Sequence, residues 1–205
     1  MRSVRSLPSN RATVTDKRAA ILRAAIQVFA RSGYFNAKVA DIARAAGVAD
    51  GTVYLYFKSK EEILHSVFDH TMEEAIAAGR AEVEKLTDPR EKLQAIARNH
   101  LSLLGADRDL AIVFQVELRG STKFMEEFSA AGMSEYLQDI RTAIEEGQAA
   151  GLFRSGLNPT VLAKILFGAL DEMATNWILS PRRYKLAPLA DQVLDIFFNG
   201  VNATP

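Results

Sequence analysis

Apolar positions recur at helical spacing along nearly the whole chain. The first repeat predicts a helix over about residues 14–32, whose apolar face holds Ile21, Leu22, Ala25, Ile26 and Phe29. Gly33 follows, and glycine readily takes the left-handed conformation that ends a helix. Two short helices are predicted next, over about residues 38–45 and 49–55, and Gly47 separates them. The chain therefore opens with three closely spaced helices.

Helix-start signals continue the pattern toward the C-terminus. Ser59 is followed three residues later by Glu62, which is a capping box and predicts a fourth helix from this point. Asp88–Pro89 and Asn158–Pro159 each pair a capping side chain with a proline that suits a first helical turn. The stretch 180–188 is rich in proline and basic residues, and it predicts a loop before a last helix. No strand-like alternation of useful length occurs, so the predicted fold class is all-α.

Composition and charge narrow the class of protein. The chain has 205 residues, of which 48% are hydrophobic, and no cysteine, which excludes a disulfide scaffold and a thiolate zinc site. The net charge of zero divides into +8 over residues 1–60 (11 basic, 3 acidic) and −8 over residues 61–205 (14 basic, 22 acidic). A basic first third indicates contact with a polyanion. The sequence shows neither a secretory signal nor a membrane span, so we expect a cytoplasmic protein with no membrane partner.

The three short helices in this basic third suit a helix-turn-helix that reads DNA. The third helix would be held inward by Val48, Val53 and Phe57. Its outward set would reach base edges or phosphates, and it consists of Gly51, Thr52, Tyr54, Tyr56 and Lys58. Gly51 would allow close approach of the backbone. The arm formed by residues 1–12, with three arginines, is expected to be mobile.

The segment GYFNAKVADIARAAGVADGTVYLYFKSKEEIL resembles the DNA-binding domain of the TetR family of repressors. The similarity rests on a glycine-aromatic turn, Asp-Ile-Ala, Ala-Gly-Val, Gly-Thr-x-Tyr-x-Tyr-Phe and Lys-x-Lys-Glu, and it covers about residues 14–64. The chain departs from the family at Ala37-Lys38, where Thr or Ser usually caps the second helix. Asn36 is then a candidate cap, and Lys38 a candidate for a charged phosphate contact. The resemblance implies a homodimer on a palindromic double-stranded DNA operator.

The residues beyond the fourth helix start predict a separate bundle. Residues 161–179 are apolar on more than one side, which indicates a helix buried both in a core and in an interface. In TetR-family proteins the last two long helices pair with those of a second subunit. The resemblance places that interface near 158–178 and 189–200, with Leu166, Leu170, Ile196 and Phe197 as its predicted residues. The acidic pair Asp171–Glu172 would fix the dimer or cap a helix.

The C-terminal half is also similar to the TetR-type repressors of fatty acid degradation, which respond to long-chain acyl-CoA. The matching residues include His100 to Leu104, Leu110 to Val113, Gln115 to Arg119 and Phe167-Gly168. The resemblance implies no cofactor but an acyl-CoA effector. The predicted ligand-binding residues are His100, Leu103, Leu104, Val113, Phe114, Gln115, Arg119, Phe167, Met173 and Trp177. Candidate cations for the phosphates of the coenzyme are Arg98, Arg108, Arg119, Lys123, Arg182 and Arg183.

Two other functions stay open at this point. The cavity could take a different hydrophobic or drug-like effector and control an efflux system, or the helix-turn-helix could be incidental to an enzyme or interaction module. No Walker A, Rossmann or Gly-x-Ser-x-Gly motif occurs, and Glu62-x-x-His65 lacks the second motif of a di-iron site, so we predict neither an enzyme nor a metal site. The predicted division is a basic arm over 1–12, a DNA-binding domain over 13–58, and a ligand-binding and dimerisation domain over 59–205.

Overall fold

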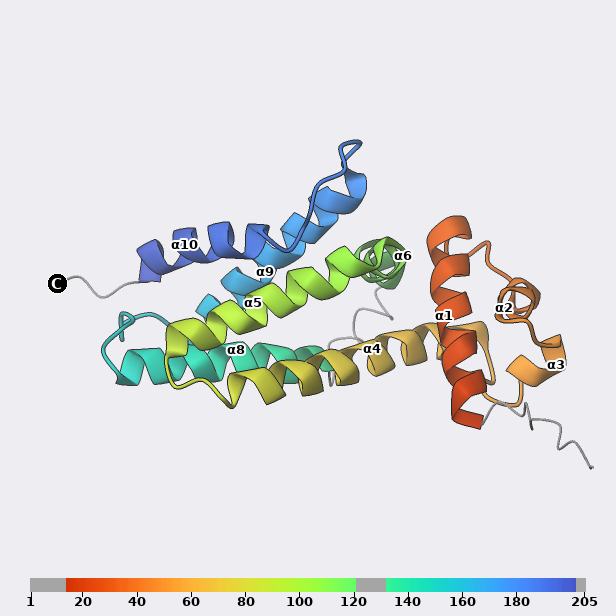
Figure 1. Ribbon diagram of the computed structural model, residues 1–205, viewed down its shortest axis with the longest axis horizontal. Coiled ribbons are helices and arrows are strands. Elements are labelled where there is room, and N and C mark those ends of the chain that lie inside the picture. The colour runs from red at the N-terminus through yellow and green to blue at the C-terminus, as the bar shows by residue number, and fades with distance from the viewer. Residues whose placement is uncertain (1–13, 121–131, 202–205) are drawn as a thin grey trace, which may run out of the picture.

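The structure is a computed structural model that describes residues 14–120 and 132–201, and the predicted basic arm over 1–12 lies outside this range. A small N-terminal group of helices stands at one end of an elongated helical bundle, as Figure 1 shows. The predicted all-α class is confirmed. Among the described residues, no helix combines the length and apolar character that crossing a membrane requires.

The N-terminal group consists of α1 (Val14–Ser32), α2 (Val39–Ala46) and α3 (Asp50–Val53). The three predicted helices are confirmed, although α3 is shorter than expected because a turn follows Val53. Gly47 closes α2 with φ of +68°, and its backbone N–H bonds to carbonyl oxygens of α2. A side chain disfavours that left-handed conformation, which explains glycine at this position. The core of the group contains fully buried Phe29, Ile42 and Val53.

The helix α4 (Lys60–Val83) runs from the N-terminal group into the bundle. Ser59 caps it, since its Oγ accepts the Glu62 N–H at 3.1 Å. The carboxylate of Glu62 accepts the N–H of Lys58 at 2.6 Å, one residue earlier than a standard capping box places the return bond. The predicted helix start is confirmed. One continuous helix connects the N-terminal group with the bundle.

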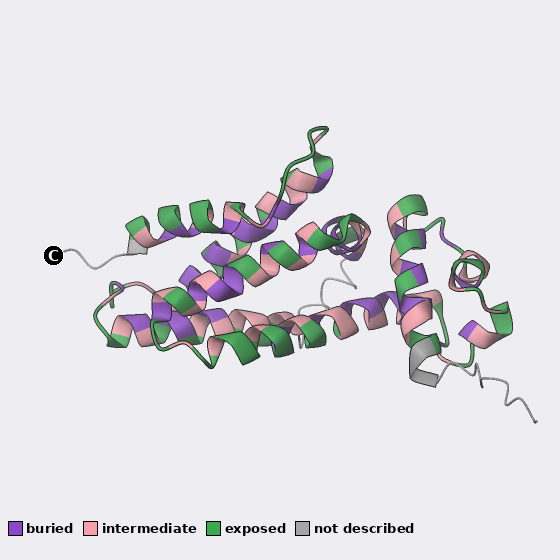
Figure 2. Ribbon diagram, viewed as in Figure 1, coloured by how far each residue is buried: buried purple, intermediate pink, exposed green. Residues whose placement is uncertain are grey.

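The bundle is completed by α5 (Pro89–Ala106), α6 (Arg108–Ile112), α8 (Gly132–Ala149), α9 (Pro159–Leu179) and α10 (Leu189–Val201). Between α6 and the undescribed residues lie a π-helical turn, η1 (Val113–Glu117), and a 3-10 turn, η2 (Leu118–Gly120). Asp88 and Asn158 cap α5 and α9 as predicted, through bonds to Arg90 N–H and to Thr160 and Val161 N–H. Purple segments in Figure 2 mark where the helices bury side chains against one another.

Close packing at the end of the bundle farthest from α1 depends on Gly147. A Cβ at this position would lie 2.2 Å from the Phe153 ring, so only glycine allows that ring to cover the last turn of α8. The Phe153 ring in turn stacks on Phe198 of α10, with centroids 6.0 Å apart. These two rings therefore hold the last turns of α8 and α10 close together at this end of the bundle.

Candidate functional site

The predicted DNA-reading residues lie on α3 and the turn after it. Val53 and Phe57 point into the core, with 0% and 2% of their surface exposed. On the other side Gly51, Lys58 and Tyr54 are exposed, and Thr52 is half-buried. Tyr56 is also half-buried, because its ring packs beside Phe57 at 6.5 Å. The alternation of inward and outward side chains agrees with the sequence-based assignment, while contact with DNA stays a prediction.

The residues before α2 do not cap it in the predicted way. Lys38 occupies the N-cap position with an exposed side chain that makes no capping bond. The Asn36 amide instead donates to the Ser32 carbonyl at 3.1 Å, so it completes the end of α1, and its prediction as the α2 cap is wrong. The exposed ammonium of Lys38 therefore stays available to an outside partner.

The turn between α1 and α2 is held by charged side chains from two other elements. The Lys60 ammonium of α4 donates to the carbonyl oxygens of Tyr34 at 2.6 Å and Ala37 at 2.8 Å, and to Phe35 at 3.2 Å. The Glu117 carboxylate of η1 accepts the Tyr34 N–H at 2.6 Å. Burial lowers the pKa of Lys60 from its ordinary value. These bonds tie the N-terminal group of α1, α2 and α3, which we call the DNA-reading group, to the bundle. They gave no signal in the sequence, because both partners are distant along the chain.

A cavity of about 550 Å³ lies within the bundle, between α4, α5, η1, α8 and α9. Its volume is in the range of pockets for small organic ligands. Seven of the ten predicted ligand-binding residues line it, namely His100, Leu103, Leu104, Phe114, Gln115, Arg119 and Phe167. The clustering of these residues agrees with a ligand site, and binding itself stays a prediction.

The other three predicted residues do not line the cavity. Val113 is completely buried, and Met173 packs against the core. The Trp177 indole donates to the Tyr184 carbonyl at 2.8 Å and so fastens the loop after α9. All three lie on or beside apolar helix faces, where spacing alone does not separate a cavity wall from a packed core.

A polar network borders the cavity at the end nearest η1. Asp171 of α9 is buried, and its carboxylate accepts bonds from the Gln115 amide at 2.9 Å and from Arg119 at 2.6 and 2.7 Å. The Thr175 hydroxyl donates to Gln115 at 3.0 Å. Since a buried carboxylate is tolerated only when it is paired, this network explains Asp171 inside an apolar helix. Its prediction as an interfacial or capping residue is wrong.

Three rings from different helices form part of the cavity wall. His100 lies 5.6 Å from Tyr136 and 6.0 Å from Phe167, measured between ring centroids. Burial lowers the pKa of His100 to about 4, although the nearby Asp171 carboxylate opposes this shift, and burial raises the pKa of the Tyr136 phenol. Both rings are therefore uncharged at neutral pH. The His100 Nε2 and the Tyr136 Oη are buried and have no hydrogen-bond partner within the described chain.

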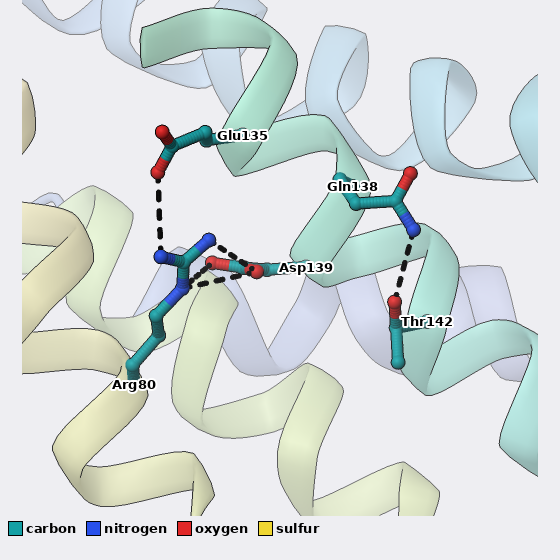
Figure 3. A network of polar contacts seen from close by, with 5 residues as sticks. All are labelled: Arg80, Glu135, Gln138, Asp139 and Thr142. Atoms are coloured by element: carbon teal, nitrogen blue, oxygen red, sulfur yellow. Dashed lines mark hydrogen bonds and ion pairs between the residues drawn. The ribbon is translucent and has the colours of Figure 1, made fainter.

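The opposite part of the cavity wall carries ion pairs that connect helices. Arg80 of α4 bonds to Asp139 of α8 at 3.0 Å and approaches Glu135 at 3.3 Å, as Figure 3 shows. Lys92 of α5 bonds to Glu146 of α8 at 2.6 Å. With Arg119, these two residues are the basic side chains that line the cavity in the described part of the chain, and each is paired with a carboxylate.

Most of the predicted phosphate-binding cations lie away from the cavity wall. Arg98 pairs with Asp191 of α10 at 2.8 Å, and Arg108 donates to the Ile178 carbonyl. Arg182 and Arg183 are exposed in the loop between α9 and α10, and Lys123 lies outside the described residues. Arg119 is the one candidate that lines the cavity. Arg80 and Lys92, which sequence analysis did not select, are better placed.

The predicted dimer residues also need correction. Leu166 and Leu170 are completely buried within this chain, and Phe197 is 8% exposed, so none of them presents an accessible face. Ile196 is 74% exposed, as predicted for an interface residue. The apolar residues that α9 does expose are Val161 and Ile165, at 52% and 55%. The prediction that α9 is apolar on more than one side agrees with these exposures, but Leu166 and Leu170 were assigned to the wrong side.

Several residues around the cavity gave no sequence signal of their own. Met72, Ile76 and Tyr136 line it from α4 and α8, where they look like ordinary core residues. The buried pairing of Asp171 could have been predicted from the sequence, since a carboxylate within a long apolar helix requires a buried partner.

Comparison with known proteins identifies both halves of the chain. Residues 21–67 match the family described as bacterial regulatory proteins, tetR family, and residues 68–200 match the C-terminal region of YsiA-like protein. The fatty acid metabolism regulator protein of Bacillus subtilis is 36% identical over 182 residues, which cover 89% of this chain and 94% of that protein.

Solved structures give the same result. The fatty acid degradation regulator FadR of Bacillus halodurans has 37% identity and a TM-score of 0.84, over 90% of this chain and 99% of that one. The transcriptional regulator FadR of Bacillus subtilis, in complex with stearoyl-CoA, has 35% identity and a TM-score of 0.85 over the same shares. Both similarities span the DNA-reading group and the bundle that contains the cavity.

Proposed function

Because this chain belongs to the TetR family of regulatory proteins, we propose that it is a homodimeric repressor of fatty acid metabolism genes that long-chain acyl-CoA releases from DNA. The observation that carries the proposal is the largely apolar cavity inside a bundle that resembles a stearoyl-CoA-binding regulator. The protein would act in the cytoplasm and without catalytic chemistry.

The DNA-binding part of the proposal rests on the outward residues of α3 and its turn. Thr52 offers a methyl group and a hydroxyl to base edges, while Lys58 and Lys38 offer exposed ammonium groups to phosphates. A two-fold symmetric pair would place its two recognition elements about 34–36 Å apart, which matches one turn of DNA. Since phosphate contacts release counterions, operator affinity would fall steeply with salt.

The dimer would form through the exposed apolar faces of α9 and α10. Val161 and Ile165 lie one turn apart on α9, and Ile196 is exposed on α10. Exposed apolar residues of this size on neighbouring helices favour an interface over solvent contact. The four-helix arrangement of the family would cover them.

The effector part of the proposal rests on the shape and polarity of the cavity. Leucine, isoleucine, methionine and aromatic side chains make up much of its wall, which suits an acyl chain. Arg80 and Lys92 stand on α4 and α5 where the wall becomes charged. Phosphates of the coenzyme would compete there with Asp139 and Glu146, which hold these cations in the free protein.

The test is a titration of an operator complex with acyl-CoAs of increasing chain length, with free coenzyme A as the reference. We expect release by long chains and none by coenzyme A alone. Ala75→Trp fills the cavity from α4 and should abolish release while operator binding persists; Ala81→Trp, on an exposed position of the same helix that does not line the cavity, is the control. No release at any chain length would overturn the effector assignment, and release by a cationic drug would favour an efflux regulator.

A further inference from the structure

The turn η1 has side chains that line the cavity and a side chain that contacts the DNA-reading group. Phe114 and Gln115 are buried and line the cavity. Glu117, two residues later, points the other way and accepts the Tyr34 N–H at 2.6 Å. Arg119 follows in η2 and returns to the cavity network through Asp171. Within six residues the chain therefore contacts the ligand space, the turn before α2, and the ligand space again.

The Glu117 carboxylate sits over the bend that ends α1. Both of its oxygens lie 3.8 Å from the position that a Cβ on Gly33 would occupy, so the side chain rests directly against this glycine. A hydrogen bond to an ionised acceptor is stronger and shorter than a neutral one, and 2.6 Å is short even for this class. The Lys60 ammonium bonds to carbonyl oxygens of the same turn. The turn before α2 is thus linked to η1 through Glu117 and to α4 through Lys60.

We propose that Glu117 is the positioning residue through which occupancy of the cavity changes the orientation of the DNA-reading group. The proposal rests on the proposed function, since it supplies the physical connection that ligand-dependent release requires. A ligand that displaces Gln115 or Arg119 from Asp171 moves η1, and this movement draws the Glu117 carboxylate away from the Tyr34 N–H or turns the Gly33 bend with it.

The geometry favours η1 over a uniform movement of the bundle. The turn has a π-helical hydrogen-bond pattern, and such turns are frequent at functional sites. It has two sets of partners, and a ligand that binds more tightly when one set is broken shifts the whole equilibrium by that difference in affinity. The helix α4 also bonds to the turn through Lys60, so loss of the Glu117 bond removes the link to η1 and leaves the link to α4.

The first experiment needs no ligand. Arg119→Lys keeps the charge beside Asp171 but loses the two-pronged bond, and Glu117→Ala removes the carboxylate at the turn. Operator affinity is measured for the native protein, both single variants and the double variant. We expect Arg119→Lys to change operator affinity about fivefold in the native background and less than about twofold when Glu117 is alanine. Equal effects in both backgrounds would overturn the proposal.

The second experiment measures the ratio of operator affinities without and with stearoyl-CoA. We expect Glu117→Ala to reduce this ratio at least about tenfold, and Glu117→Gln, whose amide oxygen still accepts a bond, to retain part of it. Glu145→Gln removes a carboxylate that pairs with Arg141 within α8 and should behave as the native protein. An unchanged ratio in Glu117→Ala would contradict the role of this residue. Absence of release in the native protein would instead contradict the proposed effector, and the ligand-free cycle would still decide the role of Glu117.

Discussion

The DNA-reading group and the bundle differ in how completely their cores are filled. In the first, the rings of Phe29 and Phe57 and the side chain of Ile42 are buried at or near 0% exposure, and the polar side chains face outward. The second encloses about 550 Å³ and keeps a carboxylate, an amide and an imidazole at its wall. A surface that must match DNA gains from a close-packed support, because small displacements spoil base contacts. A bundle that must accept a ligand leaves part of its core unfilled until the ligand binds.

The largest expected effect compares large-to-small substitutions in the two regions. Phe57→Ala should lower the free energy of unfolding by about 3–5 kcal/mol, because it leaves a void in a packed core. Leu103→Ala removes a half-buried side chain that already borders the cavity, and we expect a loss below about 1.5 kcal/mol. Chemical denaturation measures both. Equal losses would show that the bundle is as tightly packed as the DNA-reading group, and the contrast drawn above would be wrong.

For the DNA-reading group, the sequence predicted nearly everything that depends on neighbouring residues. The presence of the three helices, the Ser59 cap and the inward positions of Val53 and Phe57 follow from local rules and are confirmed, although α3 is shorter than predicted. The error at Asn36 is local, since its amide donates to the Ser32 carbonyl four residues earlier and so completes the end of α1. The bonds of Lys60 and Glu117 were missed for a different reason, because both side chains reach the α1–α2 turn from other elements and their positions depend on the tertiary fold.

For the bundle, the sequence predicted which kinds of residue take part in the site better than it predicted where each residue lies. His100 and Gln115 stood out as polar residues in apolar segments, and both lie at the cavity. In α9 the apolar residues lie on all sides of the helix. Their helical spacing alone therefore does not determine which face packs in the core, borders the cavity or contacts another subunit. Leu166 and Ile165 differ by one position, yet the first is completely buried and the second is 55% exposed.

The second prediction concerns acid stability of the cavity wall. The pKa of His100 is about 4 in the folded chain, below its ordinary value of 6.5, so the unfolded chain binds this proton more readily. The contribution of His100 to stability is therefore complete above about pH 6.5 and is lost as pH falls toward 4. We expect His100→Leu to remove about 3 kcal/mol of the pH dependence of unfolding across this window.

The control for this prediction is His70→Leu, which changes a histidine on α4 whose side chain is 40% exposed. The measurement is the free energy of unfolding at half-unit intervals between pH 4 and 7. If His100→Leu and the native protein lose stability in parallel, the imidazole is not held neutral by the bundle, and the cavity wall is wetter than its burial indicates.

A smaller effect should separate the two regions by function. Thr52→Ala removes a methyl group and a hydroxyl from the DNA-reading side of α3, and we expect operator affinity to fall about tenfold, or roughly 1–2 kcal/mol. Binding of acyl-CoA to the free protein should not change. Thr142→Ala is the matched substitution on the bundle, where the hydroxyl accepts a bond from Gln138 at 3.1 Å, and it should leave operator affinity unchanged (Figure 3). A similar loss in both variants would mean that Thr52 acts through stability.

The smallest effect on stability is expected at the ion pairs that join α4 to α8. Arg80 is 45% exposed and Asp139 27%, so water screens their attraction although the geometry in Figure 3 is two-pronged. Arg80→Gln should lower the free energy of unfolding by less than about 1 kcal/mol. The same substitution should accelerate dissociation of acyl-CoA, because Arg80 closes the cavity wall between these helices and is a proposed phosphate partner. Arg141→Gln, whose partner Glu145 lies on the same helix, is the control for loss of an arginine. A large loss of stability with unchanged dissociation would make Arg80 a structural brace, and the bundle would then depend on its charged wall as the DNA-reading group depends on its core.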